Sequence, residues 1–237
     1  QILTDAGFDV VALEKYTSKA ELLAAVADVE AIIIRSDIID KEVFDAAKQL
    51  KIVVRAGAGY DNVDLEAATA HGVCVMNTPG QNANAVAELV FALLLFTVRN
   101  RFNGASGTEL KDKKLGLLAY GNTGRNVARI AKGIGMEIFA FDPYTPADVM
   151  VKEGVTPVSS QKELFSSCDV VSLHIPATPE TKGSIGRELV SLLPKKAILV
   201  NTARKEIINE AELLELLKER EDLRYLSDIR PANHEEM

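Results

Sequence analysis

Short runs of β-branched and other apolar residues alternate with helical patterns along most of the chain. This alternation is typical of parallel sheets whose strands are connected by helices. Capping signals at Ser18 and Asp40 mark two of the helix starts. The sequence therefore predicts an α/β protein with doubly wound parallel sheets, with strands at residues 10–13, 31–35, 52–55, 73–76, 115–119, 137–141, 169–174 and 197–201.

The 237 residues fit one or two domains, and the alternation forms two blocks. We expect one domain at residues 1–80 and another at residues 104–237, which begin with a polar stretch that contains glycine. Residues 81–103 contain a long helix that is apolar on most of its circumference. Such a helix must be covered on nearly all sides, so we expect it to connect the domains and to form a homodimer interface, with a plain core helix as the alternative.

The formal charge of -7, from 34 acidic and 27 basic residues, argues against a broad nucleic-acid or membrane surface. A small anionic ligand needs only two or three cations and is compatible with this charge. The longest apolar stretch, residues 89–96, is too short to span a membrane. Cys74 and Cys168 lie in apolar runs, so we expect two buried thiols in a reducing, cytoplasmic compartment and no metal site.

A glycine-containing turn lies between the predicted strand 115–119 and an amphipathic helix predicted at 123–134. Such a turn lets the backbone approach a pyrophosphate, whose charge rests on the free N–H groups of the helix start. Asp142 lies at the end of the next strand, where a carboxylate can hold the ribose hydroxyls. No basic residue directly follows Asp142 to hold a 2′-phosphate, which favours NAD over NADP. The predicted cofactor residues are Gly121, Asn122, Thr123, Gly124 and Asp142.

The turn departs from the usual glycine pattern at Ala119, where the first glycine is expected. An alanine is tolerated at this position if its φ stays negative. Arg125 either adds a charge to the pyrophosphate or is a solvated residue at the helix start. A turn that holds no ligand is the alternative to a cofactor site.

Four further segments carry a family resemblance: RAGAGYDNVD at 55–64, MNTP at 76–79, SLHIPATPET at 172–181 and VNTAR at 200–204. They resemble the NAD-dependent D-2-hydroxyacid dehydrogenases, and within that family the phosphoglycerate dehydrogenases. The resemblance implies a flavodoxin-like substrate-binding domain followed by a Rossmann NAD-binding domain. It also implies hydride transfer between NAD and C2 of a small anionic 2-hydroxy acid.

The resemblance further implies roles for individual residues. Arg204 binds the substrate carboxylate or carbonyl beside the nicotinamide, a task that suits the planar, permanently charged guanidinium. Backbone N–H groups of the loop 56–59 hold the substrate carboxylate. The implied substrate-binding residues are Arg35, Ser36, Arg55, Ala56, Gly57, Ala58 and Gly59, and the further cofactor residues are His174, Pro176, Thr202 and Asp228.

Arg35 and Arg55 match positions that take a substrate phosphate, which implies 3-phosphoglycerate as substrate, 3-phosphohydroxypyruvate as product, and a place in serine synthesis. Arginines that bind nothing are the alternative. For His174 the alternative is a strand-end histidine with its hydrogen bonds satisfied. A glyoxylate or hydroxypyruvate reductase is the enzyme alternative for the whole chain.

The catalytic base of the family is not visible in this sequence. The family pairs a histidine with a glutamate, but here the glutamate position is Asn233 and the histidine segment falls beyond Met237. His234 is an alternative base, and Lys205 replaces the usual glycine after the arginine. We therefore expect a fragment that lacks the family's first strand and its last strand and helix. A complete variant with another base and an NAD-sensing protein without turnover are the alternatives.

Overall fold

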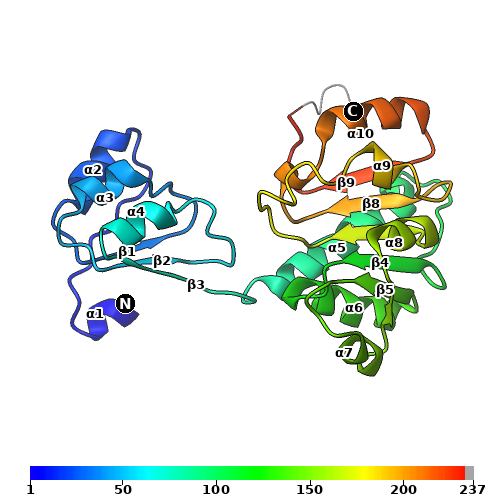
Figure 1. Ribbon diagram of the computed structural model, residues 1–237, viewed down its shortest axis with the longest axis horizontal. Coiled ribbons are helices and arrows are strands. Elements are labelled where there is room, and N and C mark those ends of the chain that lie inside the picture. Colours follow the sequence, from blue (N-terminus) through cyan, green and yellow to red (C-terminus); the bar gives the residue numbers. More distant parts are fainter. Residues whose placement is uncertain (233–237) are drawn as a thin grey trace. The chain divides into compact units, whose positions relative to one another are not determined.

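The computed structural model describes residues 1–232 and divides into two compact units, with the division after Asn82 (Figure 1). The first unit contains a parallel sheet of three strands in the order β1-β2-β3. The strands follow the chain order, without the reversal of a complete flavodoxin-like sheet. Its elements are α1 (Ile2–Asp5), α2 (Lys19–Val26), β1 (Ala31–Ile34), α3 (Lys41–Ala46), β2 (Ile52–Arg55), α4 (Leu65–Ala70) and β3 (Cys74–Asn77).

Aspartates begin two of the helices in this unit. Asp40 accepts a hydrogen bond from the Val43 N–H at 3.3 Å, and Asp64 accepts one from the Ala67 N–H at 2.9 Å. These caps satisfy N–H groups that have no partner within the helix. The strand predicted at residues 10–13 is absent, because this exposed segment pairs with no other strand in the first unit.

The helices α2, α3 and α4 cover one face of the first sheet, where Ile34 and Val53 are buried. The strand register places Ile33, Val54 and Met76 in one row on the opposite face. Ile33 is 57% exposed and Met76 is 52% exposed. The prediction of two buried thiols is therefore wrong for Cys74, which is exposed, whereas Cys168 is buried in the second unit.

The second unit contains six parallel strands in the order β6-β5-β4-β7-β8-β9. Numbered from the first strand of the unit, this is the order 3-2-1-4-5-6 of dinucleotide-binding sheets, and its direction reverses between β4 and β7. The elements are α5 (Ala83–Val98), η1 (Asn100–Phe102), β4 (Lys114–Leu118), α6 (Asn122–Ile134), β5 (Glu137–Phe141), α7 (Ala147–Lys152), β6 (Thr156–Pro157), α8 (Gln161–Ser167), β7 (Val170–Leu173), α9 (Arg187–Val190), β8 (Ile198–Asn201), η2 (Lys205–Ile207), α10 (Glu210–Glu219) and β9 (Arg224–Ser227).

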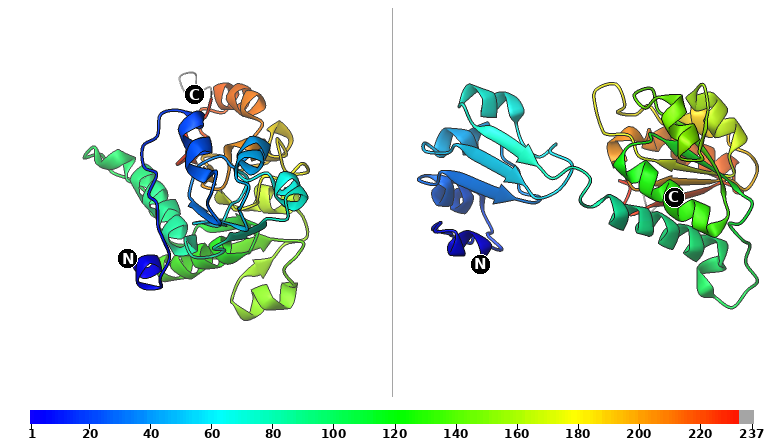
Figure 2. Two further views of the ribbon diagram at one scale, coloured as in Figure 1. Left: turned by 90° about the vertical axis from the view of Figure 1, so that its left-hand side faces the viewer. Right: turned by 90° about the horizontal axis from the view of Figure 1, so that it is seen from below.

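Helices cover both faces of this second sheet (Figure 2). Leu115 and Leu117 of β4 belong to the apolar cluster that includes α5 and α6. Leu118 of the same strand belongs to the cluster that includes α8, α9 and α10. Alternate residues of a strand point to opposite faces, so β4 contributes to two separate cores.

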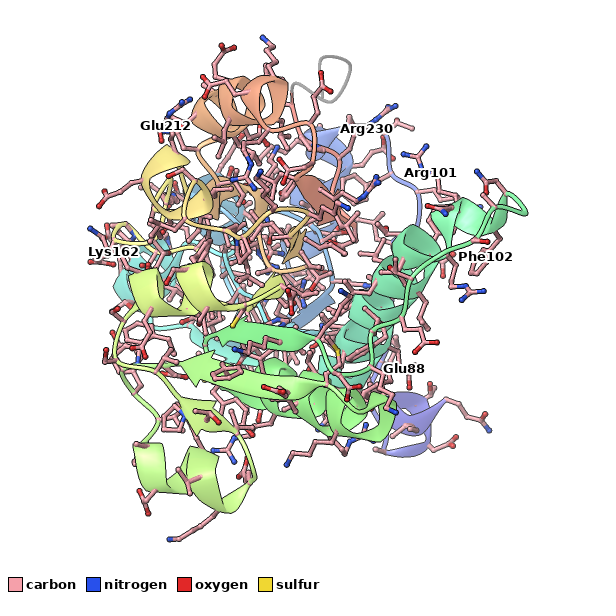
Figure 3. The ribbon with its side chains drawn as sticks, turned by 90° about the vertical axis from the view of Figure 1, so that its right-hand side faces the viewer. Glu88, Arg101, Phe102, Lys162, Glu212 and Arg230 are labelled. Carbon is pink, nitrogen blue, oxygen red and sulfur yellow. The ribbon has the colours of Figure 1, made fainter. Side chains whose placement is uncertain are left out.

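The long helix α5 is part of the second unit rather than a separate connecting segment. Val90 and Leu94 are fully buried in the same cluster as Val127 of α6. The boundary predicted near residue 104 therefore lies after Asn82, before the helix. Glu88 is exposed on α5, and Figure 3 shows Arg101 and Phe102 beyond its end. The homodimer stays a prediction.

None of the helices within residues 1–232 is both long enough and apolar enough to cross a membrane.

The packing of α5 gives a test with a matched control. Leu94→Ala removes a fully buried side chain and is expected to lower the free energy of unfolding of the second unit by about 2–5 kcal/mol. Leu95 is 43% exposed, so Leu95→Ala is expected to cost less than about 1 kcal/mol. Hydrogen exchange measured by mass spectrometry separates the two units. Equal losses of protection in both units for Leu94→Ala would contradict the assignment of α5 to the second core.

Candidate functional site

The site in the second unit is built from the carboxyl ends of four neighbouring strands. Leu118 of β4 is in register with Phe141 of β5 and Leu173 of β7, and Leu173 is in register with Asn201 of β8. The residues that follow these four therefore meet at one edge of the sheet, and they are Ala119, Asp142, His174 and Thr202. This edge includes the reversal between β4 and β7, where open parallel sheets bind ligands.

The turn after β4 has a backbone that only some residues tolerate. Ala119 has a φ of 78°, in the left-handed region. The negative φ under which an alanine is tolerated is therefore not observed, because the tight turn into α6 needs the conformation that glycine usually supplies. A side chain at Gly124 would place its Cβ 2.5 Å from the Ala119 carbonyl oxygen, whereas a Cβ at Gly121 would meet open space. Gly124 thus allows close packing of helix on strand, and Gly121 leaves room for a ligand.

Asp142 is half-buried directly after β5, and the chain around it fixes its carboxylate. Oδ2 accepts hydrogen bonds from the Tyr120 N–H at 2.8 Å and from the Thr145 hydroxyl at 3.1 Å. Oδ1 accepts one from the Tyr144 N–H at 2.8 Å. Asp142, the residue predicted to bind the ribose hydroxyls, is therefore hydrogen-bonded directly to the glycine-containing turn. Its carboxylate oxygens can still accept further hydrogen bonds.

Arg125 is engaged within the protein. Its guanidinium forms an ion pair with Glu153 and lies 5.1 Å from the centre of the Tyr120 ring. The sequence suggested either a pyrophosphate contact or a solvated side chain for Arg125. Neither alternative foresees its contacts with Glu153 and Tyr120. Glu153 lies 28 residues after Arg125, too far along the sequence for the pair to be recognised from local spacing.

Buried polar atoms without a hydrogen-bond partner lie near strand ends in both units. Within residues 1–232 they are Arg55 Nε, Ser172 Oγ, His174 Nε2 and Thr202 Oγ1. Each such atom costs about 1–3 kcal/mol in a folded protein unless a ligand or water supplies the missing partner. Three of the four belong to the ends of β7 and β8, which is a signature of a site built to bind a polar ligand.

Burial also determines the protonation of His174. Loss of solvent around the ring lowers its pKa to about 4. The imidazole is therefore neutral near neutral pH, with one nitrogen donating and the other accepting. The alternative of a strand-end histidine with all its hydrogen bonds satisfied does not fit the unpaired Nε2.

A single amide orders the loop that carries Arg204. Asn201 Oδ1 accepts from the Ala203 N–H at 3.0 Å, and Asn201 Nδ2 donates to the Arg204 carbonyl at 3.0 Å. The same Nδ2 lies 3.3 Å from the Tyr225 hydroxyl of β9. Asn201 is only 2% exposed. Sequence reasoning assigned no role to Asn201, although its place at a strand end just before Thr202 is the signal that could have found it.

Two predicted cofactor residues are less enclosed. Pro176 is exposed two residues after His174, and Asp228 is exposed directly after β9, next to the β8 end. Asn233 and His234, considered for the catalytic base, lie outside the described residues.

In the first unit, the predicted substrate residues also gather at strand ends. Ile34 of β1 is in register with Arg55 of β2, so Arg35 and Ser36 follow β1 beside Arg55, and both are exposed. A Cβ at Gly57 would overlap the Arg55 guanidinium, so glycine is needed there for Arg55 to fold over the loop.

The loop 56–59 is held at several points. The Ala56 N–H donates to the Ile34 carbonyl at 2.7 Å, and the Thr78 N–H donates to the Gly57 carbonyl at 2.9 Å. Asn77 Nδ2 donates to the Ala58 carbonyl at 2.7 Å. The segment 76–79, quoted for its family resemblance, therefore supports the other resembling loop in the same unit.

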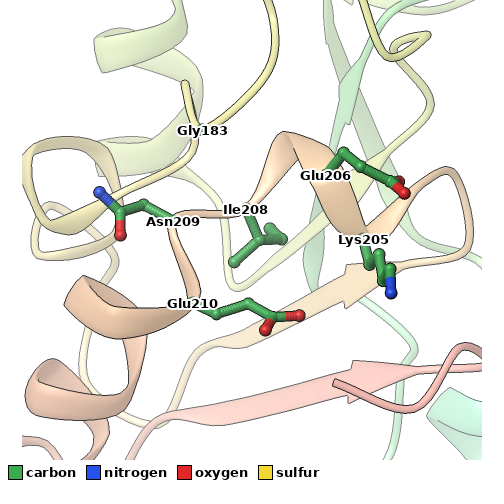
Figure 4. A pocket seen from close by; sticks show the side chains of 6 residues that line it. All are labelled: Gly183, Lys205, Glu206, Ile208, Asn209 and Glu210. Carbon is green, nitrogen blue, oxygen red and sulfur yellow. The ribbon is translucent and has the colours of Figure 1, made fainter. Parts of the chain in front are cut away.

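Lys205 and Glu206, which follow Arg204, border a separate hollow of about 400 Å³ (Figure 4). Its remaining lining residues are Gly183, Ile208, Asn209 and Glu210. The usual glycine after the arginine is thus replaced by a lysine at the start of η2.

Residues 95–234 match the family model of the D-isomer specific 2-hydroxyacid dehydrogenase, NAD binding domain. The chain belongs to this family. Its second unit is the NAD-binding domain of the family, which confirms the predicted fold class, family and cofactor.

Several relatives are more than a third identical to the chain. D-3-phosphoglycerate dehydrogenase of Methanocaldococcus jannaschii is 39% identical over 219 residues, which are 85% of this chain and 41% of that protein. Hydroxypyruvate reductase of Thermotoga maritima is 36% identical over 85% of this chain and 69% of that protein. The chain thus spans less than half the length of the first relative. The NAD+-bound crystal structure of 3-phosphoglycerate dehydrogenase from Entamoeba histolytica has 46% identity and a TM-score of 0.91, and covers 98% of this chain and 74% of that chain.

The strained turn offers a stability test. Ala119→Gly is expected to raise the free energy of unfolding by about 0.5–1 kcal/mol. Glycine adopts a left-handed conformation without the strain of an alanine, and this gain is larger than the entropic cost of ordering a glycine. Ala128→Gly, within the helical part of α6, is the control and is expected to lower it by about 1 kcal/mol or more. Denaturant unfolding measures both. If Ala119→Gly destabilises the protein as much as the control does, the conclusion that Ala119 is strained is wrong.

The depressed pKa of His174 predicts a pH dependence of stability. Between the ordinary pKa of 6.5 and about 4, the unfolded chain binds a proton that the folded state does not bind. The contribution of His174 to the free energy of unfolding therefore falls as the pH falls through this window, by on the order of 3 kcal/mol. His174→Gln is expected to remove that part of the slope in urea titrations at pH 7, 5.5 and 4. An unchanged slope in the variant would mean that His174 titrates normally.

Proposed function

We propose that the protein oxidises D-3-phosphoglycerate to 3-phosphohydroxypyruvate by hydride transfer from C2 to NAD, a reaction that would supply serine synthesis. The observation that carries the proposal is the meeting of the glycine-containing turn, Asp142, His174 and the Thr202–Arg204 loop at one sheet edge. The relatives named phosphoglycerate dehydrogenase support the choice of substrate.

The residues at this edge fit an adenine dinucleotide. The open space beside Gly121 and the N–H groups at the start of α6 suit a pyrophosphate. The Asp142 carboxylate suits the ribose hydroxyls, and the unpaired Thr202 and His174 side chains suit polar groups nearer the nicotinamide. When bound, NAD supplies the carbon that accepts the hydride.

Arg204 is proposed to orient the substrate carboxylate or carbonyl. The Asn201 side chain accepts from the Ala203 N–H and donates to the Arg204 carbonyl, so the loop loses little freedom when a substrate binds. Such ordering favours a reactive geometry, because the guanidinium fork matches two carboxylate oxygens only when it is correctly placed.

The predicted substrate-binding residues of the first unit are proposed to hold anionic groups of the substrate. The loop 56–59 offers backbone N–H groups to a carboxylate, and Arg35 and Arg55 supply positive charge for the phosphate. Arg55 carries a buried, unpaired Nε, which an anionic ligand can satisfy. Charge-assisted hydrogen bonds of this kind contribute roughly 1.5–3 kcal/mol each, enough to select a phosphorylated acid.

Hydroxypyruvate reduction is the second candidate. The similarity to the Thermotoga maritima hydroxypyruvate reductase, which extends over most of that protein, specifically favours it. The two candidates differ in whether the first unit recognises a phosphate.

Replacing Arg35 separates the candidates in the full-length natural protein. Arg35→Ala is expected to raise KM for 3-phosphoglycerate at least tenfold, while KM for the unphosphorylated hydroxypyruvate stays within twofold. Arg101→Ala, a replacement of an exposed arginine in the second unit, is the control and is expected to change neither constant.

An unchanged KM for 3-phosphoglycerate in Arg35→Ala would point to hydroxypyruvate reduction. NADH binding by the wild type without turnover of either acid would instead indicate an NAD-sensing protein.

A further inference from the structure

Tyr120 lies inside the glycine-containing turn and is held by two charged residues from other segments. Its side chain is almost fully buried at 1% exposure. Its hydroxyl donates to Glu153 Oε2 at 2.8 Å, and the Arg125 guanidinium lies over its ring at 5.1 Å. Arg125 and Glu153 also pair with each other, so the three side chains form a closed cluster.

The same tyrosine reaches the proposed cofactor residues through its backbone. Its N–H donates to Asp142 Oδ2 at 2.8 Å, and it directly follows the left-handed Ala119. A Cβ at Gly124 would lie 3.8 Å from the Tyr120 ring, so the ring also packs against the start of α6. Movement of the ring would therefore shift the turn and the carboxylate together.

The surroundings of Tyr120 keep its hydroxyl protonated, so that it can donate to Glu153. Burial raises the pKa of Tyr120, and the hydrogen bond to Glu153 raises it further. The phenol therefore remains protonated at physiological pH values and can donate its hydrogen bond to Glu153. The Arg125 charge compensates the Glu153 charge beside a buried aromatic ring.

Glu153 itself is remote from the proposed ligand contacts in sequence. It follows α7, eleven residues after Asp142, and belongs to neither the turn nor the strand ends. Removal of its carboxylate would leave the Tyr120 hydroxyl buried without this acceptor and the Arg125 guanidinium without this ion pair. Because a buried polar group without a partner is unfavourable, both side chains are then expected to move toward other partners.

We infer that Glu153 is a positioning residue for the adenosine half of NAD, acting through the Tyr120 side chain on the turn and on Asp142. The inference rests on the proposed placement of the dinucleotide across the Gly121 turn. It assigns to Glu153 an effect on cofactor affinity and none on the steps at the nicotinamide.

The test uses Tyr120→Phe, which removes only the hydroxyl, and Glu153→Met, which keeps the length but removes the acceptor. Both variants are expected to bind NADH three- to tenfold more weakly, and ADP-ribose more weakly by the same factor. The double variant is expected to bind no more weakly than the weaker single variant, because the hydrogen bond that Tyr120→Phe removes is already lost in Glu153→Met. NADH binding is measured by the fluorescence emission of NADH, without interference from tryptophan, because the chain contains none. ADP-ribose binding is measured by calorimetry.

Two further variants separate positioning from general stability. Glu153→Gln retains an acceptor and is expected to recover part of the affinity. Glu219→Met removes the ion pair with Arg187 on the same unit and is expected to leave NADH affinity unchanged. At saturating NAD, the kcat of Glu153→Met and its KM for the hydroxy acid are expected to equal those of the wild type.

NADH affinities of Tyr120→Phe and Glu153→Met within twofold of the wild type would overturn the inference. Failure of the wild type to bind NADH would overturn the proposed function instead. In that case hydrogen exchange of the Tyr120 amide still tests the coupling: faster exchange in Glu153→Met supports it, and unchanged exchange contradicts it.

Discussion

The parallel ladder of β4, β5, β7 and β8 is the constraint on which the site in the second unit depends. Parallel strands end at the same edge, and the register of these four places the residue that follows each of them side by side. The apolar residues of the strands bury both faces of the sheet, so the polar groups of the unit are left at this edge and on its surface. The position of the site thus follows from the packing of the core.

Several costs are concentrated at that edge. Ala119 is held in a left-handed conformation, and Ser172, His174 and Thr202 each bury a polar atom without a partner. The two cores that meet on β4 supply the stability that offsets these terms. Strain and unpaired polar groups that the surrounding structure maintains are typical of functional sites, because a ligand can relieve them.

Much of this arrangement could be predicted from the sequence. The alternation of strands and helices predicted β2 and β5 with their observed bounds, and it predicted β4 with each end displaced by one residue. These features depend on local periodicity, which a sequence displays directly. The strands β6 and β9 were not predicted, because β6 has only two residues and β9 contains only two apolar residues between an arginine and a serine.

The details that could not be predicted are those set by distant contacts. The sign of φ at Ala119 depends on how closely α6 packs against β4, and the role of Arg125 depends on Glu153, 28 residues later in the chain. The length of α5 was apparent, but its membership of the second core depends on α6, which begins 24 residues after α5 ends. Sequence patterns specify which face of an element is apolar, and tertiary packing decides what covers it.

The most direct test of the account is amide hydrogen exchange of the protein with and without saturating NADH. Bound NADH is expected to slow exchange at the turn 119–124, around Asp142 and in the 202–204 loop, with a weaker effect from NADPH at equal concentration. Slower exchange confined to other segments, or no change with NADH at a concentration that saturates binding, would contradict a cofactor site at this sheet edge.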